Sequence, residues 1–170
     1  MQTFLVSPNF SESAAVLDNK RLGKQRVECL QILQTLAFGP YQLWDHTIKK
    51  WIPAIEKEYN ARKFTHARKT PWYNHPAVRM WRGYTDRLAE YSLAICDEWT
   101  DRGFDDTCKD KILAILMSAS PSSIGMTPIW LGNPDFHASH RSNLLRKDFA
   151  HYSQFGWTEP TTLPYVWPVK

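Results

Sequence analysis

The sequence has little of what marks secreted, membrane-spanning or zinc-binding proteins. Its three cysteines, Cys29, Cys96 and Cys108, are an odd number without paired spacing, which is typical of reduced thiols in a cytosol and provides no zinc motif. The N-terminal stretch MQTFLVSPNF has no basic region followed by an apolar run, and no segment approaches the length of a membrane span. We therefore expect a soluble, cytoplasmic protein.

The motifs of common hydrolases and nucleotide-binding enzymes are also missing. There is no glycine-rich phosphate loop, no GxSxG elbow and no Cys–His pair with local support. His137 and His140 stand three residues apart in a predicted helix, but no third ligand has a suitable spacing and HExxH is absent. We therefore expect neither a metal site nor a cofactor.

The length and charge of the chain limit the possibilities further. A chain of 170 residues with 43% apolar content is long enough for one compact domain with a core and too short for two. The net charge of +4 is only mildly basic, so an anionic partner must be argued from clustering. Cations concentrate in 20–26, 57–69, 79–87 and 137–147, whereas several acids lie in 97–110. We expect one domain over residues 1–170.

The segment Leu17–Leu36 predicts an amphipathic helix. At helical spacing, one side of this segment is apolar and the other is polar. The apolar side carries Leu22, Cys29, Leu30, Leu33 and Leu36, and the polar side carries Arg21, Lys24, Gln25, Glu28 and Gln31. Glu28 is a lone carboxylate among cations. Arg26 points into the apolar side, where an unpaired cation is costly, so it indicates a wet pocket or a buried partner. The alternative is a surface helix with i, i+4 pairs and an arginine that reaches solvent.

Turn residues divide the rest of the chain into further helices. Gln2–Val6 is a short extended lead, Ser11 is expected to cap a turn, and Gly39-Pro40 ends the first long helix. Segment 41–73 has helical spacing over Trp44, Ile48, Trp51 and Ile52, then Ile55 and Tyr59, followed by the basic loop 61–70 with Phe64 and His66. Cations interleaved with aromatic residues suit nucleic-acid binding, although an exposed basic loop is also common in soluble proteins.

Three more helices are predicted. Asn74-His75-Pro76 opens a second long helix that ends at Asp101-Arg102-Gly103, and Thr107 with Asp110 caps a third. After the irregular stretch 118–133, Asn133-Pro134 starts a last helical region. The tail 157–170 is aromatic and proline-punctuated and should lie extended over the body. Because strand signals are almost absent, we predict an all-α, compact single-domain fold with long irregular loops.

The order of several segments resembles a known family. The helix VLDNKRLGKQRVE is followed by NHPAVRMWRGYTDRLAEYSLAICDEWTDRGF and then by HRSNLLRKD with an aromatic C-terminal run. This order is similar to that of the pyrimidine dimer DNA glycosylases, the phage-type endonuclease V enzymes. Relative to that pattern, 41–73 looks like an insertion and the tail like an extension.

The resemblance implies a compact all-α enzyme acting on duplex DNA that contains damaged pyrimidines, namely cyclobutane pyrimidine dimers. In that family the N-terminal amine attacks C1′, forms an imine with the sugar and supports strand cleavage by β-elimination, so the implied activity is that of a DNA repair glycosylase with AP-lyase activity. An α-amine suits this role because free α-amino groups have a pKa of about 7.7–8.0, whereas lysine has about 10.4. We expect a monomer.

The resemblance also implies site residues. Counted without gaps, the family's catalytic glutamate falls on Gly23, so Glu28 is the nearest candidate on the same helix. The predicted catalytic group comprises Met1, Gln2, Glu28 and Arg26, in which the amine belongs to Met1, or to Gln2 if Met1 is removed. The predicted DNA contacts are Lys20, Arg21, Lys24, Gln25, His75, Arg79, His140, Arg141 and Lys147. Two alternatives remain: a non-catalytic DNA-binding protein on the same fold, and a glycosylase for another modified base.

Overall fold

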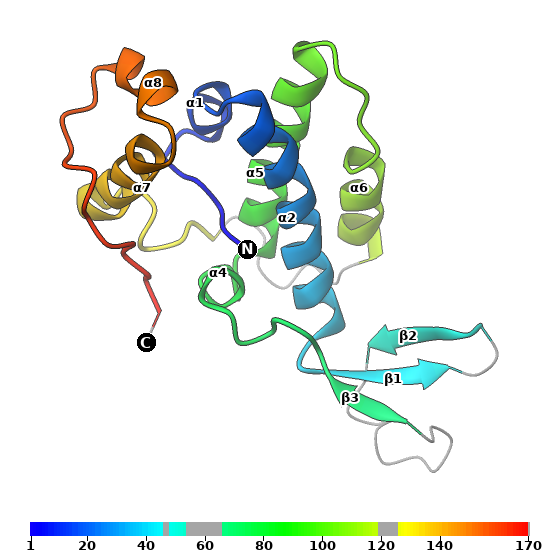
Figure 1. Cartoon of the computed structure of the whole chain (residues 1–170). Coiled ribbons are helices and arrows are strands. Elements are labelled where there is room, and N and C mark those ends of the chain that lie inside the picture. Colours follow the sequence, from blue (N-terminus) through cyan, green and yellow to red (C-terminus); the bar gives the residue numbers. More distant parts are fainter. Residues whose placement is uncertain (46–47, 54–65, 119–125, 170) are drawn as a thin grey trace.

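The computed structural model describes residues 1–45, 48–53, 66–118 and 126–169. These residues form a helical body with a small sheet that projects from one end (Figure 1). The N-terminal lead runs inside the body, where it contacts helices from both halves of the chain (Figure 1). The chain terminus is therefore an internal feature of this fold.

Helices α1 (Phe10–Ala15) and α2 (Asn19–Phe38) follow the lead. Asn9 caps α1 by accepting hydrogen bonds from the backbone N–H groups of Ser11 and Glu12, so the predicted cap at Ser11 is wrong by two positions. Gly39 ends α2 with a φ of 68°, as the sequence predicts. The Asp18 side chain, for which no cap was predicted, caps the start of α2.

The second long helix predicted from Asn74 is interrupted. Helix α4 (Pro76–Arg79) ends early, and α5 (Thr85–Asp101) begins only after a turn in which Gly83 has a φ of 80°. The apolar spacing runs across this turn because both helices face the same core, with Trp81 fully buried between them. A common core therefore made two helices resemble one in the sequence.

Segment 41–73 contains a sheet, so the all-α prediction is wrong in this part of a mainly helical fold. Its antiparallel strands are β1 (Tyr41–Asp45), β2 (Lys50–Pro53) and β3 (Ala67–Lys69), in the order β2-β1-β3. Trp44 and Trp51 oppose each other in the register, with ring centroids 5.5 Å apart. The spacing interpreted as helical is therefore a cross-strand pair. Ile55, Tyr59 and Phe64 lie outside the described residues.

The remaining helices follow the predicted order. They are α6 (Lys109–Ser118), α7 (Pro134–Lys147), α8 (Phe149–Tyr152) and the short 3-10 helix η1 (Ser153–Phe155). Asn133 caps α7 as predicted, but the carboxylate of Asp106, rather than Thr107, accepts the backbone N–H groups of Cys108 and Lys109 before α6. Residues 157–169 form no helix or strand and pack against α7.

The core lies between α2, α5 and the lead, where Leu5, Leu22 and Tyr91 are fully buried. The three cysteines are buried with free thiols. Among the described residues, no helix is both long and apolar enough to cross a membrane.

Candidate active site

Side chains, rather than a sheet, fix the N-terminal lead from Gln2 to Val6. The Gln25 amide donates to the carbonyl of Gln2 (2.6 Å) and accepts from the N–H of Phe4 (3.1 Å). The Tyr91 hydroxyl donates to the carbonyl of Phe4 (2.6 Å). Gln25 is 1% exposed and both ends of its amide are engaged, so the structure gives it contacts with the lead in place of the predicted DNA contact. Its position instead aligns the terminus.

Two histidines of α7 hold the next residue of the lead. His140 Nδ1 accepts the N–H of Leu5 (3.3 Å), and His137 Nδ1 donates to the Leu5 carbonyl (2.9 Å). Burial lowers the pKa of His140 to about 3, so the ring is neutral, and it is only 1% exposed. In place of the predicted DNA contact, the structure gives His140 a buried hydrogen bond that holds the lead. In the described part of the chain, no group of three or more His, Cys, Asp or Glu side chains is placed to hold a metal ion.

These contacts with the lead place the α-amine of Met1 beside one carboxylate, that of Glu28. The Met1 nitrogen lies 3.5 Å from Glu28 Oε1, and Lys24 Nζ lies 3.7 Å from the same oxygen. The Met1 and Glu28 side chains are only 7% and 12% exposed. Chain termini are usually poorly ordered unless specific contacts hold them. The buried and paired Met1 amine is therefore held in place by the fold. The Met1 amine therefore lies beside the carboxylate of Glu28, whereas Arg26, which was also predicted for the catalytic group, pairs with Asp106.

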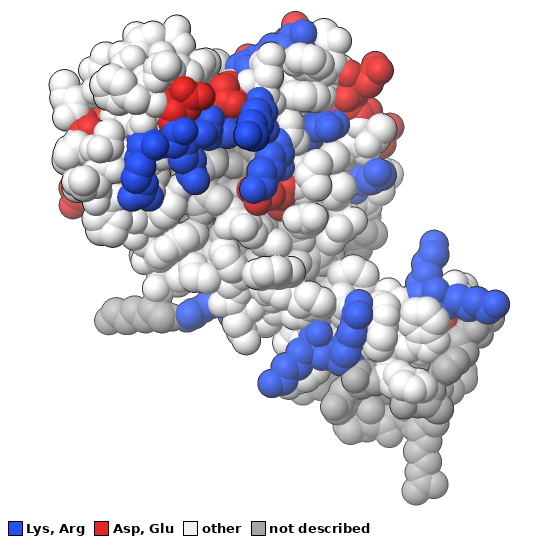
Figure 2. Space-filling model, in the orientation of Figure 1, with Lys and Arg blue, Asp and Glu red and all other residues white. Residues whose placement is uncertain are grey.

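The amine opens into a pocket of about 370 Å³, a size typical of small-ligand sites. Its base has the amine and Glu28, its walls are aromatic, and its rim carries cations from α2 and α7. The lining residues are Met1, Gln2, Phe4, Lys20, Arg21, Lys24, Glu28, His75, Lys147, Tyr165 and Trp167. Figure 2 shows this group of cations gathered over the helical body.

The positive charge at the rim is concentrated. Burial lowers the pKa of Lys147, and the neighbouring charges of Arg21, Arg146 and Lys24 lower it further. Like charges held together in this way favour an anion between them, and phosphate groups are the anion that DNA supplies. The rim therefore suits a nucleic-acid backbone.

His75 forms one wall of the pocket. Its Nδ1 accepts the N–H of Ala77 (3.1 Å), which places the proton of the neutral ring on Nε2. Burial lowers the pKa of His75, and the positive charge of the chain terminus lowers it further, against the opposite effect of Glu28. His75 thus faces the pocket as a neutral ring.

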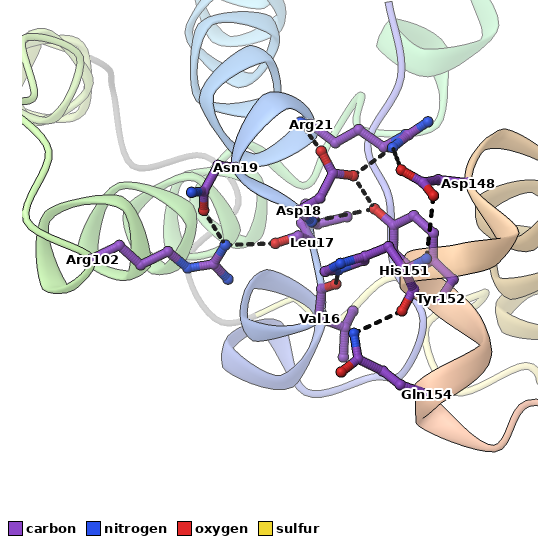
Figure 3. A network of polar contacts seen from close by, with 10 residues as sticks. All are labelled: Val16, Leu17, Asp18, Asn19, Arg21, Arg102, Asp148, His151, Tyr152 and Gln154. Atoms are coloured by element: carbon purple, nitrogen blue, oxygen red, sulfur yellow. Dashed lines mark hydrogen bonds and ion pairs between the residues drawn. The ribbon is translucent and has the colours of Figure 1, made fainter.

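A polar network orients Arg21 at the rim (Figure 3). Arg21 Nη1 lies 2.5 Å from Asp18 Oδ2 and 3.6 Å from Asp148 Oδ2, and the Tyr152 hydroxyl donates to Asp18 (2.7 Å). Burial alone would raise the pKa of Asp18, but the hydrogen bonds from Tyr152 and Arg21 outweigh it and lower the pKa to about 2. The network joins α2 to α8, so Arg21 has a structural role besides lining the pocket.

Besides Gln25 and His140, three more predicted site residues do not line this pocket. Arg26 pairs with Asp106 and lies over the Trp99 ring at 4.9 Å, so the predicted buried partner exists, but Arg26 does not line the amine pocket. Arg141 donates to Glu159 (2.7 Å) and to the carbonyl of Val6 (2.6 Å), which leaves its guanidinium engaged within the fold. Arg79 ends α4 outside the lining. The structure therefore gives Arg26 and Arg141 contacts within the fold, in place of the predicted catalytic role of Arg26 and the predicted DNA contact of Arg141.

Sequence reasoning missed the wall that the C-terminal tail provides. Tyr165 and Trp167 line the pocket together with Phe4. Burial raises the pKa of Tyr165 to about 12. The aromatic, proline-punctuated composition of the tail was the available signal, but composition does not reveal which surface a tail covers.

The side chain of Gln2 also lies in the pocket wall. Neither polar atom of its amide has a hydrogen-bond partner in the part of the chain that the structure describes. The Tyr165 phenol lies nearby, and a hydrogen-bonding contribution from Gln2 opposes the rise of the Tyr165 pKa. A buried donor and acceptor that face a pocket are suited to a polar ligand.

The family match covers most of the residues that line this pocket. Residues 1–112 match the model of a family described as pyrimidine dimer DNA glycosylase. The matched region contains the amine, Glu28, His75 and the cations of α2, whereas Lys147 and the tail residues lie beyond it. No curated protein and no solved structure matches the chain.

Proposed function

The chain belongs to the pyrimidine dimer DNA glycosylase family, and from this premise we propose that it excises damaged pyrimidine bases and then cuts the strand as an AP lyase. The nucleophile is the Met1 α-amine. The observation that carries the proposal is the buried amine 3.5 Å from Glu28 at the base of a pocket rimmed by cations. Cyclobutane pyrimidine dimers are the substrate that the family implies.

The reaction begins when the amine lone pair attacks C1′ of the damaged nucleotide. The C1′–N glycosidic bond breaks, its electron pair leaves with the base, and a new C1′–N bond joins the sugar to Met1. Glu28 accepts the proton that the amine loses and returns it to O4′ as the sugar ring opens, which gives an imine. A carboxylate beside the amine suits both the proton transfer and stabilisation of the cationic sugar.

Strand cleavage follows from the imine. Removal of a proton from C2′ allows the C3′–O bond to break, and the phosphate on that oxygen leaves with the electron pair. Water then hydrolyses the imine and releases the amine. No metal or cofactor enters any step, because the protonated imine itself withdraws the electrons.

Met1 is preferred over Gln2 as the source of the amine. Gln25 holds the Gln2 carbonyl at 2.6 Å, which fixes the distance from α2 to the terminus. Removal of Met1 would shorten the lead by about 3.3 Å, so the new amine would retreat from Glu28. The buried fit of Met1 supports an unprocessed terminus.

Binding of the duplex is assigned to the rim. Lys20, Lys24 and Lys147 line the pocket beside Arg21 and are proposed to contact phosphates on either side of the extruded nucleotide. Gln25, Arg79, His140 and Arg141 have no part in this proposal, because none of them lines the pocket.

The test is borohydride trapping on duplex DNA with a single cyclobutane dimer. Wild-type protein should form a covalent adduct that peptide mass spectrometry maps to Met1, and a protein with one extra residue ahead of Met1 should form none. Normal binding without any adduct would instead indicate a non-catalytic DNA-binding protein. An adduct with a different modified base would keep the chemistry and change the substrate.

A further inference from the structure

Trp72 has a backbone conformation that tryptophan seldom adopts. It follows Pro71 in a turn closed by a hydrogen bond from the N–H of Tyr73 to the carbonyl of Thr70 (3.3 Å), and its φ is 63°. Proline at the second position and a positive φ at the third are the signature of a type II turn, in which the third position favours glycine or asparagine. A bulky residue there is strained. Stability does not explain the choice of tryptophan.

The indole is also exposed. Trp72 is 63% exposed, and its ring meets the edge of His75 at a centroid distance of 5.8 Å. An exposed tryptophan in a strained turn loses both the benefit of burial and the benefit of a relaxed backbone. Such a combination indicates a contact made outside the protein.

The location of the ring specifies that contact. Trp72 lines two hollows of about 450 and 240 Å³, of which the first shares His75 with the amine pocket and the second shares Met1. The indole therefore borders the amine pocket through His75 in one hollow and through Met1 in the other.

The turn is held firmly on both sides of Trp72. The N–H of Thr70 donates to the carbonyl of Pro40 (2.9 Å), and Arg82 donates to the Tyr73 carbonyl and stacks on the Tyr73 ring at 3.9 Å. A side chain that must separate stacked bases needs such a rigid mount, because a mobile ring would yield to the DNA.

The charge around Trp72 fits a duplex. Figure 2 shows one group of Lys and Arg side chains over the helical body and another on the projecting sheet, with an uncharged surface between them. Arg68 and Lys69, which are exposed, belong to the sheet and lie just before the turn. Phosphates on the two charged flanks would place the bases over the uncharged surface between them. Trp72 shares a hollow with Lys69 of the sheet and with His75 of the amine pocket.

We propose that Trp72 is a wedge that inserts into the DNA stack beside the nucleotide drawn into the amine pocket. Apolar side chains that enter base steps unstack them and kink the duplex, and the indole has the size and exposure to replace a base as a stacking partner. This inference rests on the proposed function, because the pocket must receive a nucleotide.

The decisive variant is Trp72→Gly. Glycine adopts a positive φ without strain, so the thermal midpoint of the variant should be no lower than that of the wild type. Phe149→Ala serves as the control, because Phe149 is likewise 63% exposed and lies in α8. A 2-aminopurine next to the dimer reports unstacking by its fluorescence, and borohydride trapping at an abasic site reports the amine in single-stranded or duplex DNA.

If Trp72 is a wedge, Trp72→Gly should lose the rise in 2-aminopurine fluorescence. Its trapping of duplex DNA should fall by about tenfold or more, which corresponds to the free energy of one stacking contact. Trapping on single-stranded abasic DNA should stay at the wild-type level, as should every readout of Phe149→Ala. Full fluorescence and duplex trapping in Trp72→Gly would overturn the wedge. If the wild type fails to trap even single-stranded abasic DNA, the amine chemistry is wrong, while the fluorescence comparison still decides the role of Trp72.

Discussion

Gly23 packs against Trp99 so closely that a Cβ on the glycine would lie 2.8 Å from Trp99 Cζ3. A glutamate at this position would collide with an indole that also lies under the Arg26 guanidinium. The family's catalytic glutamate falls on Gly23 by ungapped counting, so this chain has no room for a carboxylate there. Glu28, on the same helix, faces the pocket instead, and this contrast motivates the first prediction.

Glu28→Gln should reduce base release and imine trapping by a factor of about 10² to 10⁴, the usual contribution of a proton-transferring group. The substitution keeps the shape of the side chain and removes its charge, so the affinity for DNA should not fall. Single-turnover excision and equilibrium binding measure the two effects. Glu90→Gln is the matched control, since Glu90 forms an i, i+3 pair with Arg87 on an exposed part of α5. Unchanged excision in Glu28→Gln would remove Glu28 from the mechanism.

Lys20→Gln and Lys147→Gln should each lower the salt dependence of duplex binding by about 0.9 unit in a plot of log K against log salt. The reason is that each rim lysine is proposed to release one counterion on contact with a phosphate. Arg141→Gln is the control, because Arg141 is engaged with Glu159 and Val6 and should affect stability without changing the slope. A changed slope for Arg141→Gln, with none for the lysines, would reverse the assignment of the binding face.

Arg26→Leu should lower the free energy of unfolding by about 2 to 4 kcal/mol, because it leaves Asp106, which is 4% exposed, without its ionic partner. Excision by the folded protein at low temperature should stay near the wild-type rate. Urea denaturation and single-turnover excision give the two values. A large loss of rate with unchanged stability would restore Arg26 as a catalytic residue.

The protein should lose stability as the pH falls from 6.5 towards 3, because burial lowers the pKa of His140 from 6.5 to about 3. The unfolded chain takes up the proton first, so the contribution of the neutral ring is complete above 6.5 and disappears as the pH approaches the folded pKa. Each pKa unit corresponds to about 1.4 kcal/mol. His137 and His75, whose pKa values are also lowered, act in the same direction.

The measurement is urea denaturation from pH 6.5 down to 3.8, a range in which Asp18, with a pKa of about 2, stays charged. His140→Gln keeps an acceptor for the N–H of Leu5 but cannot be protonated, so its stability should depend less on pH. An equal pH dependence in both proteins would assign the acid sensitivity to other groups.

The sequence alone determined the local features of this protein. The glycine that ends α2, the Asn-Pro start of α7 and the unusual position of Arg26 are all set by interactions within a few residues or by the cost of burying a charge. The order of segments was sufficient to indicate the family, which the match over residues 1–112 supports. Glu28 was selected as the carboxylate nearest to Gly23 on the same predicted helix, where it is a lone acid among cations.

Only the tertiary structure decided which polar residues face the pocket. Gln25 and His140 look like binding residues in the sequence, yet they hold the backbone of the lead from α2 and α7. The same is true of the strands in 41–73, where Trp44 and Trp51 pair across a turn and give no helix. Periodicity describes one segment at a time, whereas the amine site is formed by the lead, two distant helices and the tail. The packing between these segments, which no local pattern encodes, places the Met1 amine beside Glu28.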